Sequence, residues 1–208
     1  MNYQIELDKI IGRIESEAIL RTPKLLIHSC CAPCSSYVLE YLSNYFAITV
    51  YYYNPNIYPE EEYLRRVKEQ EQLIESMEFK NPVMFMKGDY DTNKYYELIK
   101  GHEGDKEGNE RCFLCYRLRL EEAARVAKEG GYEFFTTTLT ISPHKDAVKL
   151  NEIGEELATS YGVLFLPSDF KKRNGYKRSI ELSDKYGLYR QDYCGCVFSK
   201  RIRDNIRS

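Results

Sequence analysis

Seven cysteines are the residues of this chain most suited to chemistry, and they fall into three tight groups. The chain lacks the short, loop-rich character of a secreted disulfide scaffold, so closely spaced thiols are typical of metal ligands or redox pairs. Burial as small apolar side chains explains one isolated cysteine but not three clusters. The groups are His28-Ser-Cys-Cys-Ala-Pro-Cys34, Cys112-Phe-Leu-Cys115 and Cys194-Gly-Cys196.

The first two groups contain five thiols, Cys30, Cys31, Cys34, Cys112 and Cys115. Four thiolates close a tetrahedral zinc site, and four also hold an iron–sulfur cluster. The spacing leaves both open, although a spare thiol suits a redox centre better than a structural zinc site. A thioredoxin-like couple of Cys31 and Cys34 is a third alternative, but it gives the second group no role.

Cys194 and Cys196 form a different kind of pair, because two residues of chain span at most about 7 Å. A disulfide needs Cα atoms about 4.4 to 6.8 Å apart, so the turn must fold, and Gly195 permits unusual φ values. A bridge in so small a ring is strained and easily reduced, which predicts an electron relay. Two unpaired thiols or two further metal ligands remain alternatives.

The other polar candidates are fewer. His28, beside the thiols, and His144, after Pro143, are the histidines best placed to act as proton donors. Asp89 and Asp91 could handle protons, but solvated turn residues are the expected role.

Buried strands and the helices between them must position these groups. Apolar runs predict strands over residues 25–27, 46–53, 83–86, 134–139 and 163–166. Helices are predicted over residues 4–20, 35–42, 59–77, 93–99, 118–128, 145–161 and 179–185. Residues 101–109 are predicted to form a surface loop that delivers Cys112 and Cys115. The alternation indicates an α/β fold with an open, parallel, doubly wound sheet of about five strands and a helical C-terminal appendage. Ligands of such sheets bind outside the carboxyl ends of the strands, where the first thiol group lies.

The amino-acid composition is typical of a globular protein. The 208 residues are 43% hydrophobic and 30% charged, which fits one globular domain over residues 1–208. We expect an α/β core over residues 1–166 and a basic segment carrying the Cys-Gly-Cys pair over residues 167–208. No apolar run is long enough to span a bilayer and no signal peptide is visible, so we expect a cytoplasmic protein with no membrane partner.

The charge is unevenly distributed. Residues 171–208 contain 11 Lys or Arg against four Asp or Glu, a net +7 in a chain whose net charge is −2. A local basic surface with interleaved tyrosines suits a nucleic acid, since aromatic rings stack on unpaired bases. The candidate contacts are Lys171, Lys172, Arg173, Tyr176, Lys177, Arg178 and Arg190.

Six stretches taken together resemble the cobalamin-independent epoxyqueuosine reductases of the QueH type over nearly the whole chain. The stretches are His28-Ser-Cys-Cys-Ala-Pro-Cys34, Asn54-Pro-Asn-Ile57, Glu107 through Arg111-Cys-Phe-Leu-Cys-Tyr116, Thr137-Thr-Leu-Thr-Ile-Ser-Pro143, Phe170-Lys-Lys172 with Gly175-Tyr-Lys-Arg-Ser179, and Tyr189-Arg-Gln-Asp-Tyr-Cys-Gly-Cys196. The resemblance implies removal of the epoxide oxygen from epoxyqueuosine at the wobble position of tRNA, the last step of queuosine synthesis.

The resemblance also implies the roles of the cysteines. Cys30, Cys31, Cys112 and Cys115 would hold a [4Fe-4S] cluster, and Cys194 and Cys196 would form a redox-active disulfide. A further metal ion, iron, would lie next to the cluster, with Cys34 as a candidate ligand at a position where some relatives carry an aspartate. An electron donor would complete the cycle.

A fainter similarity extends to the nucleotide-hydrolase-like (HUP) folds of PP-loop tRNA-modifying enzymes. Those enzymes carry a Gly-rich phosphate loop after the first strand, where this chain has its cysteines, so ATP-dependent adenylation is not expected. Two alternatives to a reductase are a zinc-stabilised RNA-binding module without catalysis and an iron–sulfur-dependent enzyme that inserts sulfur into tRNA.

Overall fold

A computed structural model describes residues 2–16 and 21–207. Its centre is a parallel sheet of five strands in the order β3-β2-β1-β4-β5. The strands are β1 (Lys24–His28), β2 (Ala47–Tyr52), β3 (Val83–Lys87), β4 (Phe134–Thr137) and β5 (Leu164–Phe165). The predicted open, parallel, doubly wound α/β fold is confirmed.

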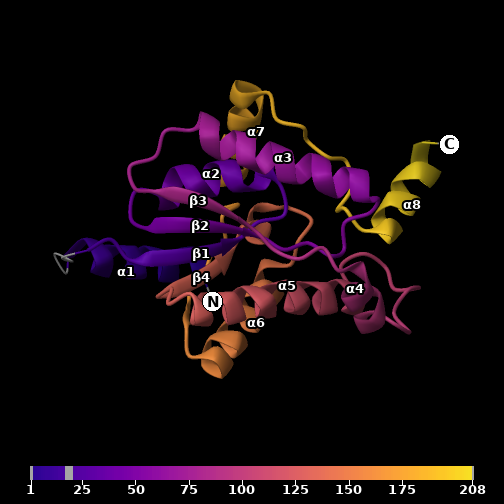
Figure 1. The fold of residues 1–208 in the computed structure, drawn as a ribbon, viewed down its shortest axis with the longest axis horizontal. Helices are drawn as coiled ribbons and strands as arrows, with labels where there is room; N and C mark the ends of the chain where they lie inside the picture. The colour runs from indigo at the N-terminus through magenta and orange to yellow at the C-terminus, as the bar shows by residue number, and fades with distance from the viewer. Residues whose placement is uncertain (1, 17–20, 208) are drawn as a thin grey trace.

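Helices cover both faces of the sheet. Figure 1 shows α2, α3 and α7 on one face and α5 and α6 on the other, with α4 and α8 at one end of the sheet. The helices are α1 (Tyr3–Ser16), α2 (Ala32–Leu42), α3 (Glu60–Ser76), α4 (Thr92–Leu98), α5 (Glu110–Glu129), α6 (Ala147–Tyr161), α7 (Gly175–Tyr186) and α8 (Val197–Arg207). A 3-10 turn, η1 (Thr138–Ile141), follows β4. None of the helices in the described residues combines the length and apolar character that a bilayer crossing requires.

The alternation of side chains along β1 divides the core into two layers. Leu25 and Ile27 pack with Leu7 and Leu39 of α1 and α2, whereas Leu26 packs with Leu120 of α5 on the other face. Because both faces of β1 are buried, its apolar run is continuous, as expected of a central parallel strand.

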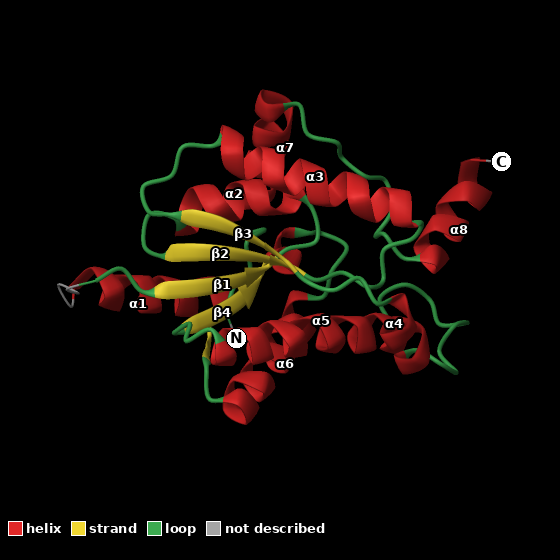
Figure 2. Ribbon diagram, in the orientation of Figure 1, coloured by secondary structure: helices red, strands yellow, loops and turns green. Residues whose placement is uncertain are grey.

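The strand order places the switch in winding direction between β1 and β4. In sheets of this kind a crevice opens at the carboxyl ends of the two strands at the switch. Figure 2 shows the yellow strand arrows converging on the end of the sheet that faces α4, α5 and α8. The first thiol group follows β1 at this end and η1 follows β4.

Several boundaries differ from those predicted. α2 begins at Ala32 and α5 at Glu110, so Cys34, Cys112 and Cys115 lie on helices. The predicted surface loop over residues 101–109 is confirmed, but α5 begins directly after it and not at residue 118. A glycine-rich stretch directly precedes Cys112-Phe-Leu-Cys115, so nothing in the sequence indicates that the helix begins after its N-cap at Asn109. α8 was not predicted.

The first helix also differs from its predicted pattern. The sequence places Ile5 on its apolar face, but the side chain is 49% exposed, while Tyr3, Leu7 and Ile11 are buried. Residues 17–20 of the predicted helix, 4–20, lie outside the described residues.

Candidate functional site

A cavity of about 570 Å³ opens at the carboxyl ends of β1 and β4. Residues from distant parts of the chain line it, including Cys30, Cys34, Lys145, Tyr176, Arg190 and Cys194. The first and third thiol groups therefore share one space, at the position where the topology predicts a ligand site.

The first thiol group forms a tight cluster after β1. The Sγ atoms of Cys30, Cys31 and Cys34 all lie within 4.8 Å of one another, and those of Cys30 and Cys31 are 3.8 Å apart. Cys31 is the N-cap of α2, and its extended backbone turns the chain from the strand into the helix. The positive end of the helix therefore faces the cluster and favours negative charge there.

These three thiols hold a shared negative charge. Hydrogen bonds with the Cys31 and Cys34 thiols hold the pKa of Cys30 well below its usual value. The bond with Cys30 raises the pKa of Cys31 to about 12, and the bonds with Cys30 and Cys31 raise that of Cys34. This group of three cysteines therefore favours one thiolate. A soft metal ion that binds there would displace the remaining thiol protons.

The second thiol group lies on the first turns of α5. The Cys112 sulfur accepts a hydrogen bond from the Gly108 backbone N–H at 3.3 Å. Cys115 is buried against Tyr95, Ile99 and Cys196. Neither belongs to the group of mutually close ligand atoms formed by the first three cysteines.

Arg119 connects the thiol groups electrostatically. Its side chain is buried, its Nε donates to the Cys115 carbonyl at 3.1 Å, and its Nη2 has no hydrogen-bond partner among the described residues. Burial works against its charge, but Cys115, Cys194 and Cys30 raise the pKa of Arg119. The charge of Arg119 therefore interacts with thiols from all three groups.

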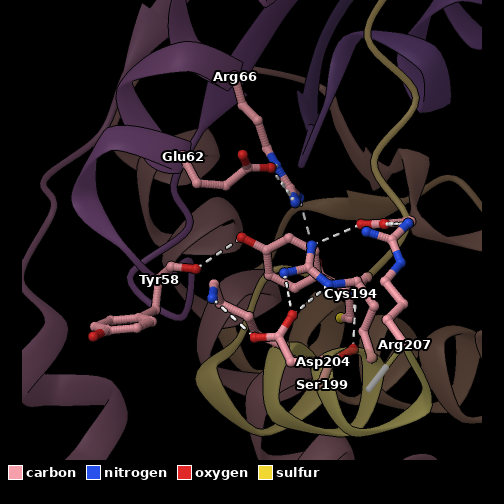
Figure 3. A network of polar contacts seen from close by, with 11 residues as sticks. Tyr58, Glu62, Arg66, Cys194, Ser199, Asp204 and Arg207 are labelled. Carbon is pink, nitrogen blue, oxygen red and sulfur yellow. Dashed lines mark hydrogen bonds and ion pairs between the residues drawn. The ribbon is translucent and has the colours of Figure 1, made fainter.

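The Cys194–Cys196 turn docks on the loop before α3. The Tyr58 backbone N–H donates to the Gly195 carbonyl at 2.8 Å, and the Tyr193 hydroxyl donates to the Tyr58 carbonyl at 2.9 Å. Figure 3 shows Arg66 on one side of this turn and Ser199 on the other. Gly195 has φ +120°, and a Cβ there would lie 3.1 Å from Arg66 Nη1. The turn therefore requires glycine.

The two thiols of this turn have unequal environments. Both are free thiols in the structure. A hydrogen bond from Cys196, followed by the charges of Lys145 and Arg119, holds the pKa of Cys194 well below its usual value. The bond to Cys194, together with burial, raises the pKa of Cys196. Cys194 lines the cavity, so the thiolate of the pair is the member that faces it.

The residues that the sequence suggests as proton donors lie in different environments. His28 is fully buried, with Nδ1 3.0 Å from Thr137 Oγ1 and Nε2 3.1 Å from the Tyr53 carbonyl oxygen. Burial lowers the pKa of His28 to about 4, so the ring stays neutral and links β1 to its neighbours. His144 lines the cavity. Asp91 caps α4 by accepting from the Asn93 N–H, a structural role.

The predicted nucleic-acid contacts fall into three places. Tyr176 and Arg190 line the cavity, with the Arg190 guanidinium 5.8 Å from the Tyr176 ring centre. Arg173, Lys177 and Arg178 line a separate, shallower hollow that also contains Glu40 and Glu181. Lys172 is exposed. Lys171 is half-buried and pairs with Asp169 at 3.2 Å.

Acidic neighbours neutralise part of the basic surface. Arg173 pairs with Asp8, and Arg178 with Glu40 and Glu181. Arg203 and Arg207 of α8 both pair with Asp192.

Three buried cations were missed by sequence reasoning. Lys145 lies in the loop between η1 and α6, close to the end of β4, a position that could have suggested it. Arg66 and Arg119 lie within amphipathic helices, where a long cationic side chain is ordinarily taken for a solvated one. Their 0% and 2% exposure therefore had no sequence signal.

Known proteins place this site in a family. The family model of Epoxyqueuosine reductase QueH matches residues 25–202. Epoxyqueuosine reductase QueH of Staphylococcus aureus (strain Mu50) is 46% identical over 203 residues, covering 96% of this chain and 84% of that protein. The protein of the same name from Streptococcus pyogenes serotype M1 is 41% identical, covering 97% and 81%. The one from Thermotoga maritima is 36% identical, covering 84% and 89%. The chain belongs to the epoxyqueuosine reductase QueH family.

Proposed function

We propose that this chain reduces epoxyqueuosine to queuosine in tRNA, removing the epoxide oxygen as water with two electrons and two protons. Family membership supports the reaction. The observation that carries it to this site is the cavity in which Cys30 and Cys34 face the same space as Cys194, beside Tyr176 and Arg190. Metal-binding thiols, a redox pair and base-stacking groups are the parts that such a reaction needs.

Cys30, Cys31, Cys112 and Cys115 would hold the [4Fe-4S] cluster that the family resemblance implies. The donor set fits, because four thiolates are the usual ligands of such a cluster. The unpartnered Nη2 of Arg119 also fits, since a sulfide-rich anion would give this buried N–H an acceptor. When bound, iron at this site would supply electron transfer and Lewis acidity toward the epoxide oxygen. Cys34 lies within 4.8 Å of Cys30 and Cys31 and would be free to hold a second iron.

The chain itself would supply the electron pair from the dithiol of Cys194 and Cys196. Formation of their disulfide releases two electrons, and an external dithiol reductant would restore the pair. The lowered pKa of Cys194 favours this, because the thiolate is the reactive form in thiol exchange. A reducing cytoplasm suits such a cycle.

The basic segment, residues 167–208, would bind the tRNA. Tyr176 and Arg190 line the cavity, where a ring and a guanidinium can stack on an unpaired base. Lys171, Lys172, Arg173, Lys177 and Arg178 lie outside that cavity lining and would bind phosphates.

The decisive experiment is anaerobic incubation of the iron-loaded protein and a dithiol reductant with tRNA that contains epoxyqueuosine, followed by nucleoside mass analysis. We expect queuosine to replace epoxyqueuosine. A protein that binds stoichiometric zinc, carries no iron and leaves the nucleoside unchanged would instead support the RNA-binding module. A thiolated nucleoside would support the sulfur-inserting enzyme.

A further inference from the structure

Lys145 is a buried cation in direct contact with the redox pair. Its Nζ donates a hydrogen bond to Cys194 Sγ at 2.8 Å, and its side chain is only 8% exposed. Both residues line the cavity. A buried ammonium needs a counter-charge, and the thiolate of Cys194 is the nearest one. Glu107, at 3.7 Å and also on the cavity wall, is the second.

The proton balance of the reaction requires a donor of this kind. Converting an epoxide to an alkene and water breaks two C–O bonds and consumes two electrons and two protons. A Cys194 thiolate and a Cys196 thiol together release two electrons when their S–S bond forms, but only one proton, from Cys196. One proton is missing.

We propose that Lys145 is the catalytic acid that supplies the second proton to the departing oxygen, and that its contact with Cys194 couples this transfer to oxidation of the pair. This inference rests on the proposed function. The balance then closes: the thiolate, the thiol and the ammonium become a disulfide, a neutral amine and two protons, and the electron pair goes to the substrate.

The coupling follows from the charges around Lys145. Burial opposes its charge, but the Cys194 thiolate and Tyr116 outweigh burial and raise the pKa of Lys145. Disulfide formation removes the thiolate, while the cation of Arg119 remains. Burial and Arg119 then favour the neutral amine against Glu107 at 3.7 Å and Tyr116, so loss of the thiolate makes the ammonium a stronger acid once the electrons have left.

Regeneration restores the starting state without another proton source. A dithiol reductant transfers two hydrogens to the disulfide, which yields thiols at both Cys194 and Cys196. The Cys194 thiol then protonates the neutral amine of Lys145 across their hydrogen bond. The thiolate and ammonium pair forms again, and every atom is accounted for.

Two substitutions separate the two roles of Lys145. In Lys145→Met the thiolate loses its cation and the acid is gone. In Lys145→Arg the cation remains, but a guanidinium does not give up a proton in proteins. Lys128→Met is the control, because Lys128 is an exposed lysine at the opposite end of α5 from Cys112.

The first measurement is alkylation of Cys194 by iodoacetamide at pH 7 in the reduced, anaerobically purified holoenzyme, followed on its peptide by mass spectrometry. We expect Lys145→Met to slow alkylation at least tenfold, and Lys145→Arg and the control to match wild type. An unchanged rate in Lys145→Met would overturn the contact on which the proposal stands.

The second measurement is single turnover of the pre-reduced holoenzyme on epoxyqueuosine-containing tRNA. Both Lys145 variants should lose 10²- to 10⁴-fold in rate with unchanged tRNA affinity, the usual effect of removing a general acid. Wild-type turnover in Lys145→Arg would overturn proton donation. A wild-type enzyme that leaves epoxyqueuosine unreduced would overturn the proposed function, and the proton role with it, whereas the alkylation contrast needs no substrate.

Discussion

The backbone N–H of Tyr58 donates to the carbonyl of Gly195 at 2.8 Å, which fixes the Cys194–Cys196 turn to the loop that precedes α3. Through this bond, residues 194–196 are held by a segment more than a hundred positions earlier in the chain. The geometry of the dithiol therefore depends on this long-range contact as well as on the local sequence.

Gly195→Ala should disturb the Cys194–Cys196 turn. The φ of +120° strains an alanine, and its Cβ would lie 3.1 Å from both Arg66 Nη1 and Ile57 Cγ1. We expect a loss of about 1–3 kcal/mol of stability and a change in the rate at which the Cys194–Cys196 pair exchanges with a dithiol reductant. Gly187→Ala is the control, because Gly187 has a φ of +62° but open space around it. Equal exchange rates in the two variants would refute a role for the turn geometry.

Serine substitutions should distinguish the cysteines that bind the proposed cluster from those that do not, by the iron content of each variant. Cys112→Ser and Cys31→Ser should cost most of the iron and the visible absorbance, because each would remove a proposed cluster ligand. Cys34→Ser should retain the four cluster irons. Iron per chain, measured after anaerobic purification, checks this. Full iron content in Cys112→Ser would remove Cys112 from the ligand set.

Cys194→Ser and Cys196→Ser should separate electron supply from metal binding. Each variant should keep the iron content of wild type but fail to turn over with a thiol reductant, since neither can form the disulfide. Turnover and iron are measured on the same samples. Undiminished turnover in Cys194→Ser would show that electrons reach the site by another route.

The stability of the protein should fall below neutral pH because of His28. Its pKa is about 4 in the folded state against 6.5 in the unfolded chain, so only the unfolded state takes up a proton between these values. Stability is therefore fully present above pH 6.5 and falls by about 1.4 kcal/mol for each pH unit down to about 4. Urea unfolding at pH 7.5 and 5.5 measures the loss. His28→Gln, which cannot titrate, should show a smaller loss, and an equal loss would assign the effect elsewhere.

Affinity for tRNA should depend on two exposed lysines. Lys172 and Lys177 are exposed and form no ion pair within the described residues. The double alanine variant should bind more weakly and reduce the slope of log affinity against log salt by about 1 for each phosphate that it no longer neutralises. Lys128→Ala, on the opposite layer, should leave the slope unchanged. An unchanged slope in the double variant would exclude these two lysines from the tRNA surface.

The sequence predicts the sheet well because a short apolar run marks each strand. Leu26, for example, lies in a continuous apolar run that only a central parallel strand explains. The start of α5 was missed because its N-cap, Asn109, follows glycines and charges typical of a loop. Amphipathic α8 was missed because its apolar positions, such as Ile202 and Ile206, are sparse and mostly exposed.

The thiols of the site could be found from sequence, but the charges around them could not. The spacing of the cysteines can be read directly from the sequence. The short Cys-Gly-Cys stretch also restricts the conformations that its turn can adopt. The contact between Lys145 and Cys194 joins residues 49 positions apart and depends on how α6 follows η1. The position of Lys145 shortly after the end of β4 is the sequence signal that sets it apart from a surface lysine.

The same helix, α5, carries Cys112 and Cys115 at its start, Arg119 one turn later and the core residue Leu120 beside it. A packing defect beneath α5 would therefore displace the two proposed cluster ligands and the charge of Arg119 together. If the proposed cluster is bound there, variants in this apolar layer would lose its colour and the activity at temperatures where the sheet is still intact, and a screen based on folding alone would miss them.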